Sequence, residues 1–145
     1  MKMFDFGDGP VPARRHRNGG GWVANTAQVA DDAYVGPDAR VHGRAYVGPN
    51  AQVSDRAQVF DYAQVYGHAQ VYGDARVFDG ALVYGRAHVY DRARVFDYAR
   101  VSGDARVYDS AQIYGDAWVY DNAKAYGDAR VCDNAKVYGD TKVSE

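Results

Sequence analysis

The sequence predicts an all-β solenoid, a coil of short parallel strands, on the strength of three observations. The first is a six-residue register that holds from Val23 to Val143 with no residue inserted or lost. Its first position is Val in 19 of 21 units, and its fifth is Ala from Ala27 to Ala135. The second is a longer period of 18 residues. The third is a Gly or Asp in nearly every unit, which excludes helix.

Composition favours a narrow interior over a layered globular core. The 145 residues allow one domain, and the 47% that are hydrophobic include much Ala and Tyr. Leu82 and Ile113 are the only Leu and Ile residues, whereas a layered core is built from Leu, Ile and Phe. We therefore expect an interior made almost wholly of Val and Ala.

Charge and cysteine content restrict the partners that we expect. The 17 Lys and Arg residues against 19 Asp and Glu predict neither a nucleic-acid partner nor an anionic membrane. Cys132 is the only cysteine, so no internal disulfide is expected. The N-terminus has no apolar run typical of a signal peptide. The expected location is therefore cytoplasmic or virion-associated.

Residues 1–22 do not follow the repeat, and we expect them to form an N-terminal cap or tail on a β-helix of residues 23–145. A solenoid needs such a cap because its first coil would otherwise leave apolar side chains and unpaired backbone groups open. Phe4, Phe6 and Trp22 are the apolar side chains that we assign to this lid.

Each unit predicts a short strand followed by a corner. In Ala-x-Val the outer two side chains point one way and the middle one points the other, so Ala and Val face inward. The third position of the unit is mostly Gly or Asp, and both tolerate left-handed or tight-turn backbone. We therefore expect the corner to turn at this residue.

The 18-residue period sets the size of the coil. Phe60, Phe78 and Phe96 are 18 residues apart, and Asp61, Asp79 and Asp97 share this spacing. Three units per coil give a triangular prism of about seven coils. At about 4.8 Å per stacked strand the rod is roughly 30–35 Å long.

Two units, Val35–Arg40 and Val47–Gln52, have the form Val-Gly-Pro-Asp/Asn-Ala-x. They resemble the hexapeptide repeat of left-handed parallel β-helix proteins, and this resemblance is what implies the left-handed coil. The tandem Tyr-Gly-Asp-Ala-Arg-Val units after Gly20–Val23 are also similar to a group of bacterial and phage proteins, some of which carry an acyltransferase label by homology only. The resemblance covers residues 19–145.

The resemblance implies an acyltransferase as the alternative function. Such enzymes generally act as trimers, bind acetyl-CoA or an acyl carrier between prisms, and use a histidine near a protruding loop as general base. Here no insertion marks such a loop. His68, at a corner, and His88, on a flat face, are the candidate bases of this alternative, and each is also explained as a solvated variant of a repeat position.

Metal binding is not expected. The carbonic anhydrases of this fold place three His around zinc, and the chain lacks the pair of close His residues that this requires. The column of Asp61, Asp79 and Asp97 could hold a cation such as calcium, but Gly occupies the equivalent position elsewhere, so turn geometry explains the Asp residues without a metal.

Aromatic residues at the second position of the unit should form columns along the corners. Stacked rings would stiffen the corners by about 0.5–1.5 kcal/mol per pair, and as exposed aromatic surface they would also suit a glycan or protein partner. The candidate binding residues are Phe60, Phe78, Phe96 and Tyr114 on one corner and Tyr72, Tyr90, Tyr108 and Tyr126 on the second. Tyr66, Tyr84, Tyr120 and Tyr138 should line the third.

One flat face should carry a basic row one residue wide, formed by Arg40, Gln58, Arg76, Arg94, Gln112 and Arg130. We interpret this row as solvated and neutralised by acidic corners beside it, with a nucleic-acid role as the weaker alternative. At the other end of the rod the repeat runs to Val143 with no capping helix. We expect another copy or a protein partner to cover that coil, with Cys132 nearby.

Together these features predict a non-catalytic structural or binding module without a cofactor, and the resemblance implies an association with a phage or prophage. It would engage a protein or glycan through its corners or its open end. The alternative is the acyltransferase, with acetyl-CoA as its cofactor.

Overall fold

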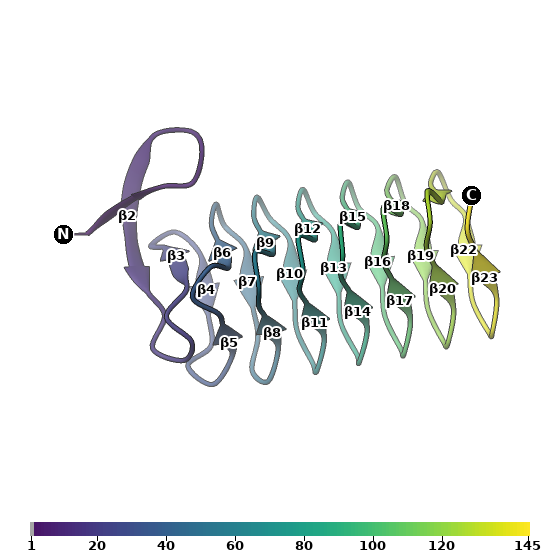
Figure 1. Cartoon of the computed structure of the whole chain (residues 1–145), viewed down its shortest axis with the longest axis horizontal. Helices are drawn as coiled ribbons and strands as arrows, with labels where there is room; N and C mark the ends of the chain where they lie inside the picture. Colours follow the sequence, from purple (N-terminus) through teal and green to yellow (C-terminus); the bar gives the residue numbers. More distant parts are fainter. Residues whose placement is uncertain (1) are drawn as a thin grey trace.

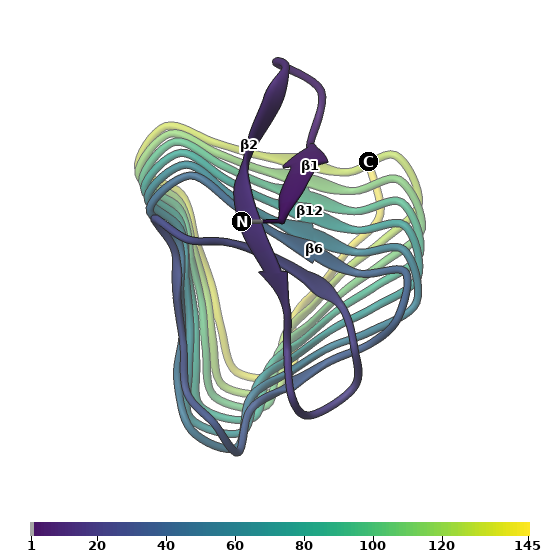
Figure 2. The same ribbon diagram turned by 90° about the vertical axis from the view of Figure 1, so that its left-hand side faces the viewer.

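Three parallel β-sheets run side by side along a rod and enclose a triangular interior (Figures 1 and 2). The computed structural model describes residues 2–145, and this part of the chain contains no helix and so none that could cross a membrane. Seen from its N-terminal end, the chain turns counterclockwise as it recedes, which is a left-handed coil (Figure 2). The predicted fold class, a left-handed parallel β-helix, is confirmed.

Each sheet takes one strand from every coil. The first sheet has the order β1 (Met3–Asp5), β2 (Pro10–Arg15), β3 (Trp22–Ala24), β6 (Arg40–Val41), β9 (Gln58–Val59), β12 (Arg76–Val77), β15 (Arg94–Val95), β18 (Gln112–Ile113) and β21 (Arg130–Val131).

The other two sheets have seven strands each. The second contains β4 (Gln28–Val29), β7 (Tyr46–Val47), β10 (Gln64–Val65), β13 (Leu82–Val83), β16 (Arg100–Val101), β19 (Trp118–Val119) and β22 (Lys136–Val137). The third contains β5 (Tyr34–Val35), β8 (Gln52–Val53), β11 (Gln70–Val71), β14 (His88–Val89), β17 (Arg106–Val107), β20 (Lys124–Ala125) and β23 (Lys142–Val143).

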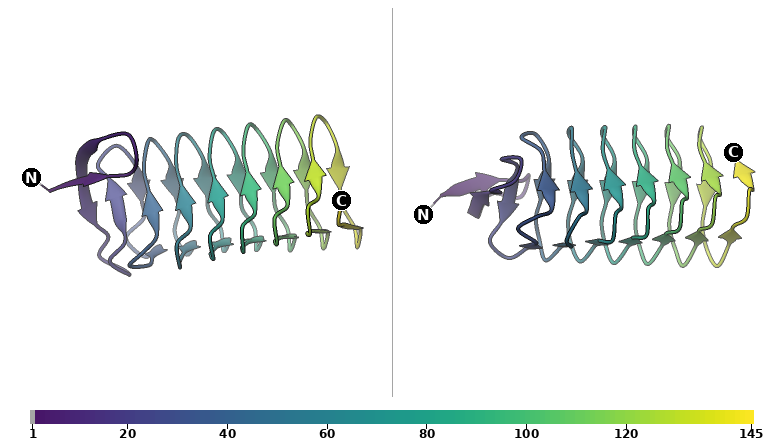
Figure 3. Two further views of the ribbon diagram at one scale, coloured as in Figure 1. Left: turned by 45° about the horizontal axis from the view of Figure 1, so that its top comes forward. Right: turned by 90° about the horizontal axis from the view of Figure 1, so that it is seen from below.

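The strands pair 18 residues apart, so the predicted three units per coil are confirmed. Arg76 lies opposite Arg94, and Val77 lies opposite Val95. Because β3–β23 fill three sheets equally, they make seven coils, which stack at a regular spacing along the rod (Figure 3). We number each corner by the sheet that it follows. Corner 1 follows the first sheet (residues 60–62 and their equivalents), corner 2 follows the second sheet (66–68) and corner 3 follows the third sheet (72–74).

The interior consists of the Val and Ala side chains that the register predicts. Val and Ala from Val35 to Ala123 are fully buried in every unit, with Ile113 in one Val position. Burying one Val side chain stabilises the fold by about 1.5–3 kcal/mol. Each coil buries its apolar face only against its neighbours, so this stabilisation depends on the stack.

The corners turn at the third residue of the unit, as predicted. Asp61 has φ 58° and Gly67 has φ 65°, and the left-handed conformation recurs through most of the coils. The Ala63 N–H closes this turn by donating to the Phe60 carbonyl at 3.2 Å. Pro49 is an exception because its ring cannot adopt positive φ, and Asn50 takes that conformation instead, with φ 69°.

An antiparallel hairpin extends the first sheet at the N-terminal end. Strands β1 and β2 pair with each other, and β2 pairs with β3 in antiparallel register (Figure 1). The segment after β2 follows the edge of the first coil, where Gly21 N–H donates to the Val35 carbonyl at 2.9 Å. His16, which lay in the basic run of the sequence, is buried there, and its Nε2 lies 2.8 Å from the Ala33 carbonyl.

Candidate functional site

The predicted aromatic column of corner 1 is a continuous stack of parallel rings. Phe60 and Phe78 have ring centroids 5.0 Å apart and an angle of 4° between their planes, and the same spacing continues through Phe96 to Tyr114. These rings are half-buried. One edge of each ring is therefore available at the surface, while both faces are used by its neighbours.

The tyrosine column of corner 3 has the same geometry. Tyr72, Tyr90, Tyr108 and Tyr126 stack with centroid separations from 4.8 to 5.3 Å. Burial raises the pKa of the Tyr72, Tyr90 and Tyr108 phenols, and the neighbouring rings of the column raise that of Tyr90 further. The column therefore favours the neutral, hydrogen-bonding form of these side chains.

The column of corner 2 is interrupted. Tyr66 stacks on Tyr84 and Tyr120 on Tyr138, but Ser102 stands between the two pairs. The Trp118 indole fills this place, with its N–H donating to Ser102 Oγ at 3.0 Å. Trp118 comes from a flat face and not from the corner, so the second-position pattern alone did not indicate it.

The three residues assigned to the cap pack together at the hairpin, where Phe4 meets Phe6 edge to face at 4.8 Å between ring centroids, and each of these two rings also stacks on a further ring. Phe4 stacks on Trp22 at 4.7 Å, and the Arg15 guanidinium covers Trp22 at 4.6 Å from the ring centroid. Phe6 instead stacks on His42 at 4.6 Å. Because aromatic or cationic groups already occupy the faces of Trp22, this ring is not a free platform for a ligand.

His42 joins the hairpin to the column of corner 1. Its ring lies between Phe6 and Phe60, at 4.8 Å and 4° from Phe60. Its Nε2 is buried and has no hydrogen-bond partner among residues 2–145. Burial lowers the pKa of the imidazole, although the Gln58 side chain and the Asp61 carboxylate oppose this in part.

The two histidines of the acyltransferase alternative lie on different elements. His68 is exposed at corner 2, beside Asn50 and Gln52. His88 is half-buried on β14, where the Tyr72 hydroxyl lies 3.2 Å from its Nδ1. Burial, followed by the nearby Arg106 guanidinium, lowers the pKa of His88.

The acidic column of corner 1 has a structural explanation. The carboxylate of Asp61 accepts a hydrogen bond from the backbone N–H of Asp79 at 3.3 Å, and Asp79 accepts one from Asp97 at 3.1 Å. Asp91 and Asp109 repeat this pattern at corner 3. Within residues 2–145 there is no group of three or more His, Cys, Asp or Glu side chains arranged to hold a metal ion.

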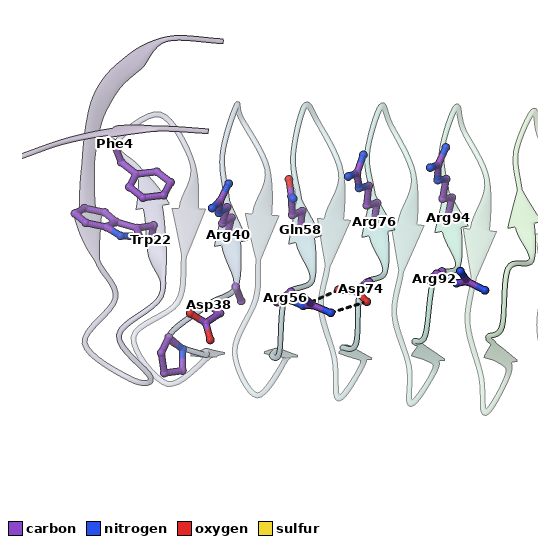
Figure 4. A pocket seen from close by; sticks show the side chains of 12 residues that line it. Phe4, Trp22, Asp38, Arg40, Arg56, Gln58, Asp74, Arg76, Arg92 and Arg94 are labelled. Atoms are coloured by element: carbon purple, nitrogen blue, oxygen red, sulfur yellow. Dashed lines mark hydrogen bonds and ion pairs between the residues drawn. The ribbon is translucent and has the colours of Figure 1, made fainter. Parts of the chain in front are cut away.

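The basic row of the first sheet lines a concavity of about 600 Å³ (Figure 4). Arg40, Arg76 and Arg94 project from paired strands, and Arg92 lines the same concavity from corner 3. Phe4 and Trp22 line the end of this concavity nearest the hairpin. Only the strand residues followed from the sequence pattern, because Arg92 occupies a corner position that holds Asp, Ser or Arg in other coils.

No ion pair within residues 2–145 joins the strand residues of this row to the acidic corners, although Asp38 and Asp74 of corner 3 line the same concavity. The ion pairs of residues 2–145 join corner or cap residues to each other, as in Arg56 with Asp74 at 2.9 Å and Arg86 with Asp104 at 3.0 Å. The third-position Asp carboxylates lie on the corners and accept backbone N–H groups of the next coil. Arg76, Arg92 and Arg94 form no ion pair within the described chain.

Two exposed tyrosines were not predicted as candidate binding residues from the sequence. Tyr62 and Tyr98 occupy the fourth position of corner 1 and are 65% and 72% exposed. Gly80 stands between them, and a Cβ there would lie 3.0 Å from Tyr98 Cδ1. The Tyr98 ring therefore rests on the glycine. A fourth-position pattern was not apparent because this position varies more than any other in the unit.

The fold and the surface define the chain as a β-solenoid repeat protein. A family model described as the YdcK β-solenoid repeat matches residues 69–85, 99–112 and 111–127. These segments lie in the central and later coils, and they contain tyrosines from the columns of corners 2 and 3. Neither a curated protein nor a solved structure gives a match to the chain.

Proposed function

We propose that this protein is a non-catalytic binding module that presents rows of side chains to an elongated glycan or protein partner. One observation carries the proposal: equivalent side chains of successive coils stand in register, one strand spacing apart, along every face and corner. A partner with its own linear repeat would meet the same contact several times. Repeated weak contacts on one rigid scaffold add up to a higher effective affinity.

The aromatic columns remain candidates for part of this surface. Their ring faces are used in stacking, so a partner would contact ring edges and, in the tyrosine columns, hydroxyl groups. The exposed Tyr62 and Tyr98 would add ring faces at corner 1. Aromatic groups of this kind are enriched where proteins meet partners.

Self-association or a protein partner at the last coil belongs to the same proposal. Strands β21, β22 and β23 each pair with a neighbour on one side, and unpaired strand edges are templates for further pairing. Association with a phage particle remains a prediction of the sequence resemblance.

Acyl transfer with acetyl-CoA is the alternative function. The observation that favours it is the contact between Tyr72 and His88, together with the lowered pKa of His88, since a neutral imidazole is the form that accepts a proton. Against it, His88 does not line the concavity of the first sheet or the one beside His68.

Binding measured against ligand length tests the proposal. Titration calorimetry with a panel of neutral glycans, acidic glycans and repetitive peptides, each in a series of lengths, should find at least one class whose affinity rises with length up to that of the rod, roughly 30–35 Å. The proposal is wrong if no polymer binds, or if the shortest ligand binds as tightly as the longest.

A further inference from the structure

We infer that the concave face of the first sheet binds a linear acidic polysaccharide, with Arg76, Arg92 and Arg94 contacting its carboxylates. The inference deepens the proposed function and rests on it. It names both the surface and the chemical class of the ligand, whereas the proposed function requires only that some elongated partner is bound.

The shape of the surface suits a thin chain that lies along the rod. The concavity of about 600 Å³ extends from the hairpin, where Phe4 and Trp22 line it, past β9 and β12 to β15 (Figure 4). At the hairpin end Arg40 already makes a cation–π contact, because its guanidinium lies 5.1 Å from the centroid of the Phe4 ring. The three free arginines lie at the opposite end.

Positive charge dominates this surface, because five arginines and only two aspartates, Asp38 and Asp74, line the concavity. Not one of the 21 outward strand positions from Trp22 to Lys142 carries an acidic side chain. Arg56 is paired with Asp74 by contacts of 2.9 and 3.1 Å, which leaves Arg76, Arg92 and Arg94 without a carboxylate partner in the described chain. Like charges held close together repel each other, and a bound polyanion relieves that repulsion.

The spacing of the arginines is that of the coil. Arg76 and Arg94 are directly paired residues of neighbouring strands, so their Cα atoms are about 4.8 Å apart along the rod. An extended chain of sugar acids offers a carboxylate at each residue, at a comparable repeat. Arginine is suited to such a ligand because its planar guanidinium makes two parallel hydrogen bonds to one carboxylate.

The surroundings favour an acidic glycan over a nucleic acid. Single-stranded nucleic acids are held by stacking of bases on free aromatic rings, but Phe4 and Trp22 stack on each other and Arg15 covers Trp22. A duplex is wide, and its phosphates would meet the acidic corners on both sides of the row, at Asp79 and Asp91.

The test uses oligogalacturonates of increasing length and their methyl esters, which share the backbone but lack the charge. Calorimetry with the full-length protein should show binding of the acid form that strengthens with length and weakens with added salt. The esters should bind at least about tenfold more weakly, the change expected for one lost charge-assisted contact.

The substitutions for the test are residues that other coils carry at the same position. Arg76→Gln and Arg94→Gln introduce the residue that Gln58 and Gln112 already place in this row, and Arg92→Ser introduces the residue found at Ser110. Each should weaken binding about tenfold. Arg106→Gln removes the same charge from the third sheet and should change the affinity less than about twofold. Equal unfolding midpoints will show that all four variants fold.

Several results would overturn the inference. Esters that bind as well as acids would exclude carboxylate recognition, and an equal loss in Arg106→Gln would exclude this face. Tighter binding of single-stranded DNA or polyglutamate would identify another class of ligand. If neutral glycans or repetitive peptides bind while acidic glycans do not, the inference fails and the proposed function stands. If no polymer binds, both fail.

Discussion

The carboxylate of Asp79 accepts a hydrogen bond from the backbone N–H of Asp97, 18 residues further along the chain, at 3.1 Å. The same Asp79 has φ 55°, so one residue both turns the corner and ties its coil to the next. Glycine at the same place allows the turn but offers no acceptor. From Asp55 to Asp121 each Asp at this position therefore adds one hydrogen bond between neighbouring coils, and each Gly adds none.

Substitutions of Asp79 should separate these two roles. Asp79→Gly keeps the backbone conformation and loses one hydrogen bond, so it should lower the free energy of unfolding by about 0.5–1.5 kcal/mol. Asp79→Ala should cost about 1–2 kcal/mol more than Asp79→Gly, because alanine keeps the Cβ that is strained in the left-handed region and lacks the polar side chain that lets Asp tolerate it. Denaturant unfolding measures both variants, and an alanine variant as stable as the glycine variant would contradict the account.

His42 should make the stability of the fold depend on pH. Its pKa is lower in the folded chain than its unfolded value of about 6.5, so its stabilising contribution is complete above pH 6.5 and is lost as the pH falls through the folded pKa. His42→Phe should reduce this dependence to the part that His88 contributes, because the pKa of His88 is also lowered, and should raise stability by about 1 kcal/mol, since it also removes the buried, unpaired Nε2. Unfolding midpoints on both sides of pH 6.5 test this. A variant that keeps the dependence in full would show that another group causes it.

The tyrosine column of corner 3 should give the opposite dependence at alkaline pH. Burial raises the folded-state pKa of Tyr72, Tyr90 and Tyr108 above the unfolded value of about 10. Their stabilising contribution is therefore complete below pH 10 and is lost as the pH rises through the folded pKa. Tyr90→Phe, which reproduces the stacking of the phenylalanine column, should reduce this loss. Denaturant unfolding at neutral and alkaline pH checks it, with an unchanged loss as the contrary result.

Two neighbouring residues of β10 test the assignment of the interior. Val65 is fully buried, whereas Gln64 projects outward and is exposed. Val65→Asp places an unpaired carboxylate in the interior and should unfold the chain or cost more than about 4 kcal/mol. Gln64→Asp should cost less than about 1 kcal/mol. Circular dichroism on heating compares the two, and similar midpoints would show that the inward assignment of Val65 is wrong.

The periodic part of the fold was predictable because each repeat position has one environment. The first residue of the unit is buried from Val35 to Val137, and the 18-residue spacing of the phenylalanines determined the number of units per coil. The hairpin β1–β2 was not predictable in detail, because residues 1–22 contain no repeat that relates one residue to another. Sequence alone assigned Phe4 and Phe6 to one lid, and their rings do meet edge to face at 4.8 Å, but the stacking of Phe6 on His42 was not predicted.

The candidate site was predictable only where it follows the register. The row of Arg76 and Arg94 follows the sixth position of the unit, but Arg92 reaches the same concavity from a corner, where the residue type varies. Trp118 shows the same limit, since it contacts Ser102 across a spacing of 16 residues and not 18. Contacts between different positions of the unit depend on side-chain direction, which the period does not specify.

Light scattering over a range of protein concentrations, with and without acetyl-CoA, tests most directly whether the solenoid is a binding module or an enzyme. The account predicts a mass that acetyl-CoA does not change, either that of a monomer or a series of assemblies that grows with concentration. A stable trimer that acetyl-CoA tightens, and that loses this response in His68→Asn or His88→Asn, would contradict the account and favour the acyltransferase.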